Sequence, residues 1–177
     1  LRDLSHIPIV LLMFCLLWND SQCLPKRLTD LFRQAFHYLV KRYMNQAGFP
    51  IDDDGAIDSE VNTLIQDVGE RALKGLLEPG AKLVFNEHDF APGVVDKACE
   101  VGLLSRERTR SKLTIKRSTT FFHKTFQEFS AGSYLASLAE TKEEDFLNYL
   151  TQIKKERLDE LEYLLRFCCG YSRASAK

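Results

Sequence analysis

The strongest constraint on the fold is a set of apolar residues that recur at steps of one, three and four along two stretches of the chain. An α-helix turns once in about 3.6 residues, so this spacing places the apolar residues on one side of a helix. The two stripes predict a mainly helical protein. They consist of Leu31, Phe32, Ala35, Phe36, Leu39, Val40, Tyr43 and Met44, and of Val61, Leu64, Ile65, Val68, Ala72 and Leu76.

A short β-structured segment is predicted in the middle of the chain. Residues 82–85 fit a short strand, and residues 94–101 fit a helix. Leu103-Leu104, a polar turn and the alternating residues 113–115 fit a β-hairpin, because a half-exposed strand alternates apolar and polar side chains. This order of elements is that of a winged-helix unit.

Two residues mark helix ends within this segment. Asn86 precedes Glu87 and Asp89 and fits the N-cap of a short helical turn, where carboxylates are favourable. Gly102 occupies the position of a C-terminal stop after residues 94–101.

Three more helices are expected after the hairpin, over residues 125–138, 145–153 and 156–169. The fold class predicted from the whole pattern is mainly α, with a winged-helix unit that carries a small β-hairpin and is followed by a helical domain.

The apolar run over residues 7–18 allows three interpretations. A transmembrane helix needs about 20 apolar residues, and this run is shorter. A secretory signal has a basic start, whereas Arg2 and Asp3 cancel each other here. A buried core helix fits the length best, so no membrane association is expected.

The formal net charge is −1, so the whole chain has no bulk attraction to nucleic acid or to anionic membranes. The five cysteines are an odd number, and none forms a Cys-x-x-Cys pair with zinc spacing, which favours free thiols in a reducing compartment. The first residue is Leu, not Met, and residues 1–4 fit the middle of a helix. We therefore expect the sequence to begin inside a longer polypeptide.

No catalytic constellation is present in the sequence. None of the nine glycines lies in a P-loop pattern, so the chain is not expected to be an enzyme. The acidic residues 52–54 suggest a calcium loop around Gly55, but Pro50 and Val61 would then occupy ligand positions that they cannot fill. A solvated acidic turn is favoured, and no metal site is predicted.

The predicted hairpin is basic, which leaves nucleic-acid binding as the alternative function. A basic wing beside a helix can contact DNA phosphates. The helix before it offers few groups that read base edges, so a solvated surface hairpin is favoured. The basic residues are Arg106, Arg108, Arg110, Lys112, Lys116 and Arg117.

His123 lies where a predicted strand ends and a predicted helix begins, directly after Phe121 and Phe122. A histidine beside an apolar strand is commonly a structural residue. A side chain fixed at a strand–helix junction can also hydrogen-bond a phosphate. The residues by themselves leave both interpretations open.

The segment around His123 resembles a signature of the NOD-like receptors (NLRs), which are intracellular immune sensors with a NACHT nucleotide-binding module. Residues 7–12, 24–32 and 102–104 are similar to other parts of the family. Lys124, Ala131-Gly132 and residues 164–170 are most similar to the CARD-bearing inflammasome NLRs. The segment itself reads Phe122-His123-Lys124-Thr125-Phe126-Gln127-Glu128-Phe129.

The resemblance implies a domain assignment and a location. It makes residues 1–22 the end of the first helical domain of a NACHT module, 23–122 the winged-helix domain and 123–177 the start of the second helical domain. It implies a cytoplasmic regulatory segment that couples the ADP or ATP state of a separate nucleotide-binding domain to autoinhibition and oligomerisation.

The resemblance also implies two cofactor-binding residues, with ADP or ATP bound mainly by the separate domain. His123 would reach the β-phosphate of ADP, and Pro8 would lie against the adenine. The implied partners are the nucleotide-binding domain and leucine-rich repeats of the same polypeptide, and other copies or related receptors on activation. The Walker A and B motifs are absent here, so any slow NTPase activity would belong to the whole receptor.

Overall fold

A computed structural model describes residues 8–21, 24–48, 54–110 and 115–171. The chain divides into two compact units, Leu1–Val61 and Asn62–Lys177. The described residues are mainly helical with one small antiparallel sheet, which confirms the predicted fold class at that level. Among them, no helix combines the length and the apolar character that crossing a membrane requires.

The first unit contains α1 (Pro8–Ser21), α2 (Leu28–Gln46) and the first residues of α3 (Asp54–Leu77). The stripe predicted on α2 is largely confirmed. Its inward-facing residues are nearly inaccessible to solvent, whereas Leu39, Tyr43 and Met44 are only partly buried. α1 packs against α2. The buried apolar residues of α2 are Leu31, Phe32, Ala35, Phe36 and Val40.

α1 corrects one expectation. The helix is present, but it is not a fully buried core helix, because Leu11 and Trp18 are 51% and 56% exposed. A helix that is apolar on all sides has more apolar surface than a single neighbouring helix can cover. The buried side of α1 consists of Ile9, Val10, Met13 and Leu17.

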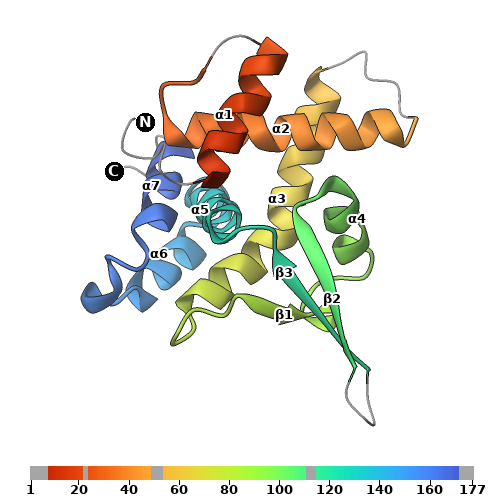
Figure 1. The fold of residues 1–177 in the computed structure, drawn as a ribbon. Helices are drawn as coiled ribbons and strands as arrows, with labels where there is room; N and C mark the ends of the chain where they lie inside the picture. Colours follow the sequence, from red (N-terminus) through yellow and green to blue (C-terminus); the bar gives the residue numbers. More distant parts are fainter. Residues whose placement is uncertain (1–7, 22–23, 49–53, 111–114, 172–177) are drawn as a thin grey trace. The chain divides into compact units, whose positions relative to one another are not determined.

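The second unit contains the rest of α3 and all the strands. After α3 come β1 (Val84–Asn86), the 3₁₀ turn η2 (Glu87–Asp89) and α4 (Val94–Val101), followed by the strands β2 (Leu104–Arg110) and β3 (Ile115–Phe121). The sheet is antiparallel with the order β1-β3-β2, so β3 lies between the other two strands (Figure 1). Leu104 pairs with Phe121, and Val84 pairs with Thr120.

The helix-end predictions for this segment are confirmed. The Asn86 side chain accepts a hydrogen bond from the Asp89 backbone, and the Asp89 carboxylate accepts one from the Asn86 backbone N–H at 3.0 Å. Gly102 ends α4 in the left-handed conformation, with φ of 90°. The hairpin is longer than predicted, because residues expected to form a polar turn continue strand β2 instead; residues 111–114 lie outside the described residues.

The chain ends in α5 (Lys124–Thr141), α6 (Glu143–Gln152), the 3₁₀ turn η3 (Lys155–Arg157) and α7 (Glu162–Tyr171). The single helix predicted over residues 156–169 is therefore wrong. A turn separates η3 from α7 and places Arg157 against the end of α3, where its guanidinium donates to the carbonyl oxygens of Leu76 at 2.9 Å and Leu77 at 2.8 Å. These carbonyls have no partner inside α3, because the last turn of a helix leaves its acceptors free.

α5 packs closely against two other helices of this unit. A Cβ atom on Gly132 would lie 2.6 Å from the Leu164 carbonyl oxygen of α7, and one on Gly69 of α3 would lie 2.5 Å from Tyr134 Cβ. Phe129 fills the α5–α7 contact and meets the Phe167 ring edge to face, at 5.2 Å between centroids. Both crossings therefore require glycine.

We predict that Gly132→Ala destabilises the protein by about 2 kcal/mol, because the added methyl group would overpack a contact made partly of backbone. The measurement is urea unfolding followed by circular dichroism. Gly170→Ala is the matched control, since Gly170 is an exposed helical glycine of α7. There alanine should be neutral or stabilising. Equal destabilisation by both substitutions would contradict the close crossing.

Candidate functional site

His123 is the N-cap residue of α5, and one residue, Phe122, separates it from the end of strand β3. Its backbone is extended, with φ of −151° and ψ of 147°, and its carbonyl oxygen accepts a hydrogen bond from the Phe126 N–H at 2.9 Å. The predicted strand–helix junction is thus present. The histidine stands at the positive end of an 18-residue helix, where backbone N–H groups favour an anion.

The hydrogen bonds of His123 define which ring nitrogen carries the proton. Nδ1 lies 3.3 Å from the Thr125 backbone nitrogen and 2.8 Å from Thr125 Oγ1. A backbone N–H can only donate, so Nδ1 must accept and the proton of the neutral ring must be on Nε2. Nε2 makes no hydrogen bond with any of the described residues. It is therefore a donor that remains available for an acceptor such as a phosphate oxygen.

Burial lowers the pKa of His123 below its ordinary value of 6.5. Protonation of Nδ1 would also break the hydrogen bond from the Thr125 backbone N–H and would place a cation at the positive end of α5. The site therefore holds a neutral imidazole at neutral pH. Such a ring binds an anion as a hydrogen-bond donor and not as a counter-ion.

This lowered pKa has a consequence for stability. Below pH 6.5 the unfolded chain binds a proton that the folded His123 does not, so stability falls as the pH decreases from 6.5 toward the folded pKa. We predict that His123→Asn, which keeps a capping acceptor but cannot titrate, weakens this pH dependence. Unfolding by urea at about pH 7.5 and about pH 5.5 measures the difference. An unchanged pH dependence would contradict the lowered pKa.

Gln127 anchors the first turns of α5 to the rest of the unit. Its Nε2 donates to the Lys82 carbonyl oxygen at 3.0 Å and approaches the Ala72 carbonyl oxygen of α3 at 3.4 Å. Gln127 is 1% exposed, so its amide lies away from water, and the contact to Ala72 is buried whereas the one to Lys82 is part-buried. This buried amide ties the helix that carries His123 to α3 and to the segment before β1.

We predict that Gln127→Leu destabilises the fold by about 2 kcal/mol, because buried carbonyl oxygens would lose their donor. Gln66→Leu is the control. Gln66 is exposed and bonds the Ser137 hydroxyl at 2.9 Å, so its loss should change stability by less than about 0.5 kcal/mol. The anchoring role would be wrong if the two variants unfolded at the same urea concentration.

Glu128 is the second buried polar residue that the sequence pattern did not single out. Its side chain is 3% exposed and forms an ion pair with Lys124, at 3.2 Å between Nζ and Oε1. Burial raises the pKa of Glu128, and the charge of Lys124 opposes this shift. Lys124 therefore has a carboxylate partner one turn along the same helix.

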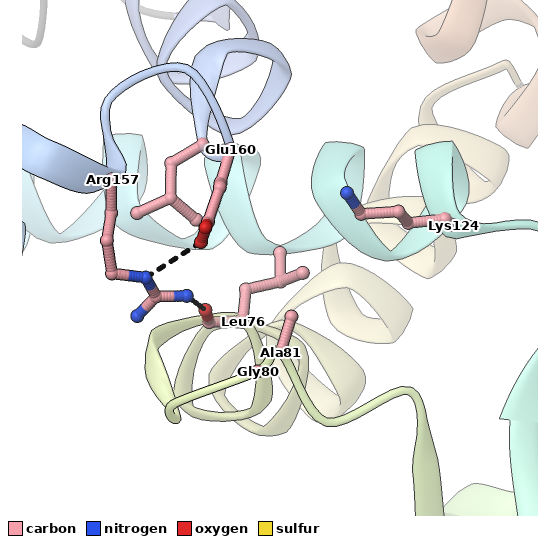
Figure 2. Close-up of a pocket in the computed structure, with 7 residues that line it drawn as sticks. Leu76, Gly80, Ala81, Lys124, Arg157 and Glu160 are labelled. Carbon is pink, nitrogen blue, oxygen red and sulfur yellow. Dashed lines mark hydrogen bonds and ion pairs between the residues drawn. The ribbon is translucent and has the colours of Figure 1, made fainter.

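Two small pockets lie beside this part of α5. The first encloses about 160 Å³, and Figure 2 shows Arg157 hydrogen-bonded to Glu160 and to the end of α3, with Lys124 on the opposite side. The second encloses about 100 Å³. Ligand pockets commonly enclose about 300 to 1,000 Å³, so neither pocket accommodates a nucleotide. Their linings are Leu76, Gly80, Ala81, Lys124, Arg157, Glu160 and Leu161, and Leu83, Thr120, Phe121, Lys124 and Gln127.

Pro8, the other residue assigned to nucleotide binding, is the exposed first residue of α1. It belongs to the first compact unit, whereas His123 belongs to the second. Each site residue is therefore placed within its own unit, and the predicted joint action of the two on one nucleotide stays a prediction.

The basic hairpin is partly neutralised by acidic neighbours. Arg106 forms ion pairs with Glu87, at 2.6 Å, and with Asp96 of α4, and Arg117 lies 3.7 Å from Glu87. Arg106 therefore holds the hairpin against α4 and η2, and it is not free to grip a phosphate backbone. This arrangement does not favour the nucleic-acid alternative. Arg108 is exposed, and the side chains of Arg110, Lys112 and Lys116 lie outside the described set.

No group of three or more potential metal ligands occurs within the described part of the chain. Asp54 and Gly55 are the first residues of α3, so this end of the predicted acidic turn is helical instead; residues 50–53 lie outside the described residues.

The chain is similar over its whole length to a protein of the NLR family. It is 30% identical, over 185 aligned residues, to NLR family CARD domain-containing protein 4 of Xenopus tropicalis. The chain spans 17% of the length of that relative. No protein-family profile matches the chain. The similarity supports the predicted resemblance to the NLR family, and the assignment of individual segments within such a protein stays a prediction.

Proposed function

We propose that this chain is a regulatory segment of an NLR-type innate immune receptor of the cytoplasm. In this role it couples the ADP or ATP state of a separate nucleotide-binding domain to autoinhibition and oligomerisation. The observation that carries the proposal is His123, a neutral imidazole fixed at the N-terminus of α5 with Nε2 available as a donor. The similarity to an NLR relative along the whole chain supports it.

The proposal includes a winged-helix domain that ends at the His123 junction. The strand order β1-β3-β2, with α4 directly before the β2–β3 hairpin, supports this assignment. The sheet and α4 are held together by the ion pair between Arg106 and Asp96. In this arrangement the chain leaves β3, the central strand of the sheet, and His123 lies at the start of α5.

The residues of the second unit fit an ADP β-phosphate as a ligand. A phosphate oxygen accepts hydrogen bonds, and the neutral His123 ring and the start of α5 supply donors and a positive dipole end. When bound, ADP would supply the negative charge that these groups stabilise. In the proposed receptor the separate nucleotide-binding domain holds most of the nucleotide, and Pro8 contributes an apolar surface for the adenine.

The coupling follows from how α5 is attached. His123 caps this helix, Gln127 ties it to α3, and Gly132 packs it against α7. A contact between His123 and ADP therefore restrains several helices and not only one side chain. Loss of the contact removes a bias toward the closed state, because a ligand shifts a conformational equilibrium by its differential affinity. The released surfaces would then meet other receptor copies.

The test of this function is His123→Leu in the full-length protein. We predict faster release of bound ADP and oligomerisation without an activating ligand, because leucine has no donor for a phosphate. Loss of one hydrogen bond to a charged group corresponds to at least about a ten-fold weaker affinity. Nucleotide retained through size-exclusion chromatography and the mass of the eluting species measure the two effects.

His88→Leu is the matched control, since His88 is exposed in η2 and lies away from the start of α5 in the sequence. It should keep its nucleotide and its monomeric state. If His123→Leu behaved like this control, the proposed phosphate contact would be wrong.

A further inference from the structure

We infer that the β2–β3 hairpin of one copy of this chain binds the first turn of α6 in a second copy through opposite charges. The basic face of the hairpin consists of Arg108 and Arg117. The acidic turn consists of Glu143, Glu144 and Asp145. This inference rests on the oligomerisation that the proposed function includes, and it assigns a pair of contact surfaces to it.

The basic face is an unfavourable arrangement within the hairpin itself. Arg108 and Arg117 lie directly opposite each other on two antiparallel strands, where like charges destabilise a sheet. Both residues are exposed. Among the described residues Arg108 forms no ion pair, and Arg117 forms one, with Glu87 at 3.7 Å. The hairpin therefore carries two adjacent positive charges that an acidic partner would stabilise.

The neighbouring charges on β2 do not neutralise the basic face. Arg106 lies on the same side of the strand, but its guanidinium is paired with Glu87, at 2.6 Å, and with Asp96. Glu107 lies on the other side, because successive side chains of a strand alternate between its two faces. The unbalanced charge thus lies farther along the hairpin than its contact with α4.

The acidic turn carries the opposite charge. All three of its carboxylate residues are exposed, and none forms an ion pair within the described part of the chain. Carboxylates at a helix N-terminus stabilise the helix itself. Here three follow one another, so the turn stays negative even with Lys142 directly before it. α6 has no buried residue, so this charge lies on a helix that is open to a partner.

The positions of the two surfaces favour a contact between copies. Figure 1 shows the hairpin and α6 on opposite sides of α5 within the second unit, so the two surfaces do not meet in one copy. Complementary surfaces at different places on one molecule join copies head to tail, which builds a ring or a filament. Nucleic acid fits the same charge less well, because Arg106 is already paired and the whole chain has a net charge of −1.

Charge reversal in the full-length protein tests this contact. The His123→Leu protein, which should assemble without a ligand, is the background, and light scattering measures the mass of the assembly. The hairpin reversal is Arg108→Glu with Arg117→Glu. The turn reversal is Glu143→Lys with Glu144→Lys. Each should weaken assembly at least about ten-fold, because like charges then face each other. Protein with both reversals should assemble like the background, since the charges are again complementary.

Two further variants control for total charge and for folding. Lys41→Glu with Arg42→Glu reverses two exposed cations of α2 and should leave assembly unchanged. Arg108→Thr removes the like-charge pair, so it should not lower the urea concentration at which the chain unfolds. It should still weaken assembly about three-fold, the effect of one exposed ion pair.

The outcomes separate this contact from the proposed function. If the background assembles and either reversal leaves assembly unchanged, the contact is wrong and the proposed function stands. Failure of the combined reversals to restore assembly in a folded protein would also overturn the contact. A DNA mobility shift that the hairpin reversal abolishes would overturn it too, because the arginines would then serve nucleic acid.

A background protein that stays monomeric would contradict the proposed function, and the 177-residue chain then decides the contact. A mixture of hairpin-reversed and turn-reversed chains is complementary, whereas each chain alone repels its own copies. By sedimentation velocity, the mixture should associate at least about ten-fold more tightly than either chain alone. Equal association of the mixture and the separate chains would overturn the inference.

Discussion

The close packing of α5 against α3 and α7 is the contact on which the second unit depends. At Gly69 and Gly132 the helices approach so closely that no side chain fits between them. Phe129, Phe167 and Leu135 are buried around these crossings. This packing fixes the direction of α5, and so fixes the place of its N-terminal cap, His123. The proposed contact of His123 with a ligand depends on this packing, because the helix behind the histidine is held by α3 and α7.

Five polar side chains lie in the buried surface of α5; four of them have a partner, whereas the Ser133 hydroxyl has none among the described residues. Gln127 donates to backbone carbonyl oxygens, Glu128 pairs with Lys124, and the Ser130 hydroxyl donates to the Phe126 carbonyl oxygen at 2.9 Å. A buried polar group is costly unless it is hydrogen-bonded. Of these three side chains Gln127 bonds outside α5, so a rotated helix would leave its buried amide without partners.

The sequence predicted local structure better than it predicted contacts. The α2 and α3 stripes, the Asn86 and Gly102 helix ends and the His123 junction follow from short-range spacing, and the structure contains them. The role of Gln127 could not be foreseen, because its acceptors lie 45 and 55 residues away in the chain. The close helix contacts at Gly69 and Gly132 could not be predicted either, because the residues that they meet also lie far away in the chain.

Two errors show what the sequence pattern lacks. An apolar run predicted a buried α1, but hydrophobicity does not reveal how much of a helix its neighbours cover. The C-terminal pattern predicted one helix, where a turn instead brings Arg157 to the carbonyl oxygens of α3. The two pockets beside α5 are likewise set by packing between distant segments.

The central claim is that His123 donates from Nε2 to the β-phosphate of ADP held mainly by another domain. A high-resolution structure of the full-length protein with ADP tests it most directly. The account predicts Nε2 within about 2.7 to 3.2 Å of a β-phosphate oxygen, with Nδ1 still bonded to Thr125. A bound ADP whose phosphates make no contact with His123, or a ring whose Nδ1 faces the phosphate, would contradict it.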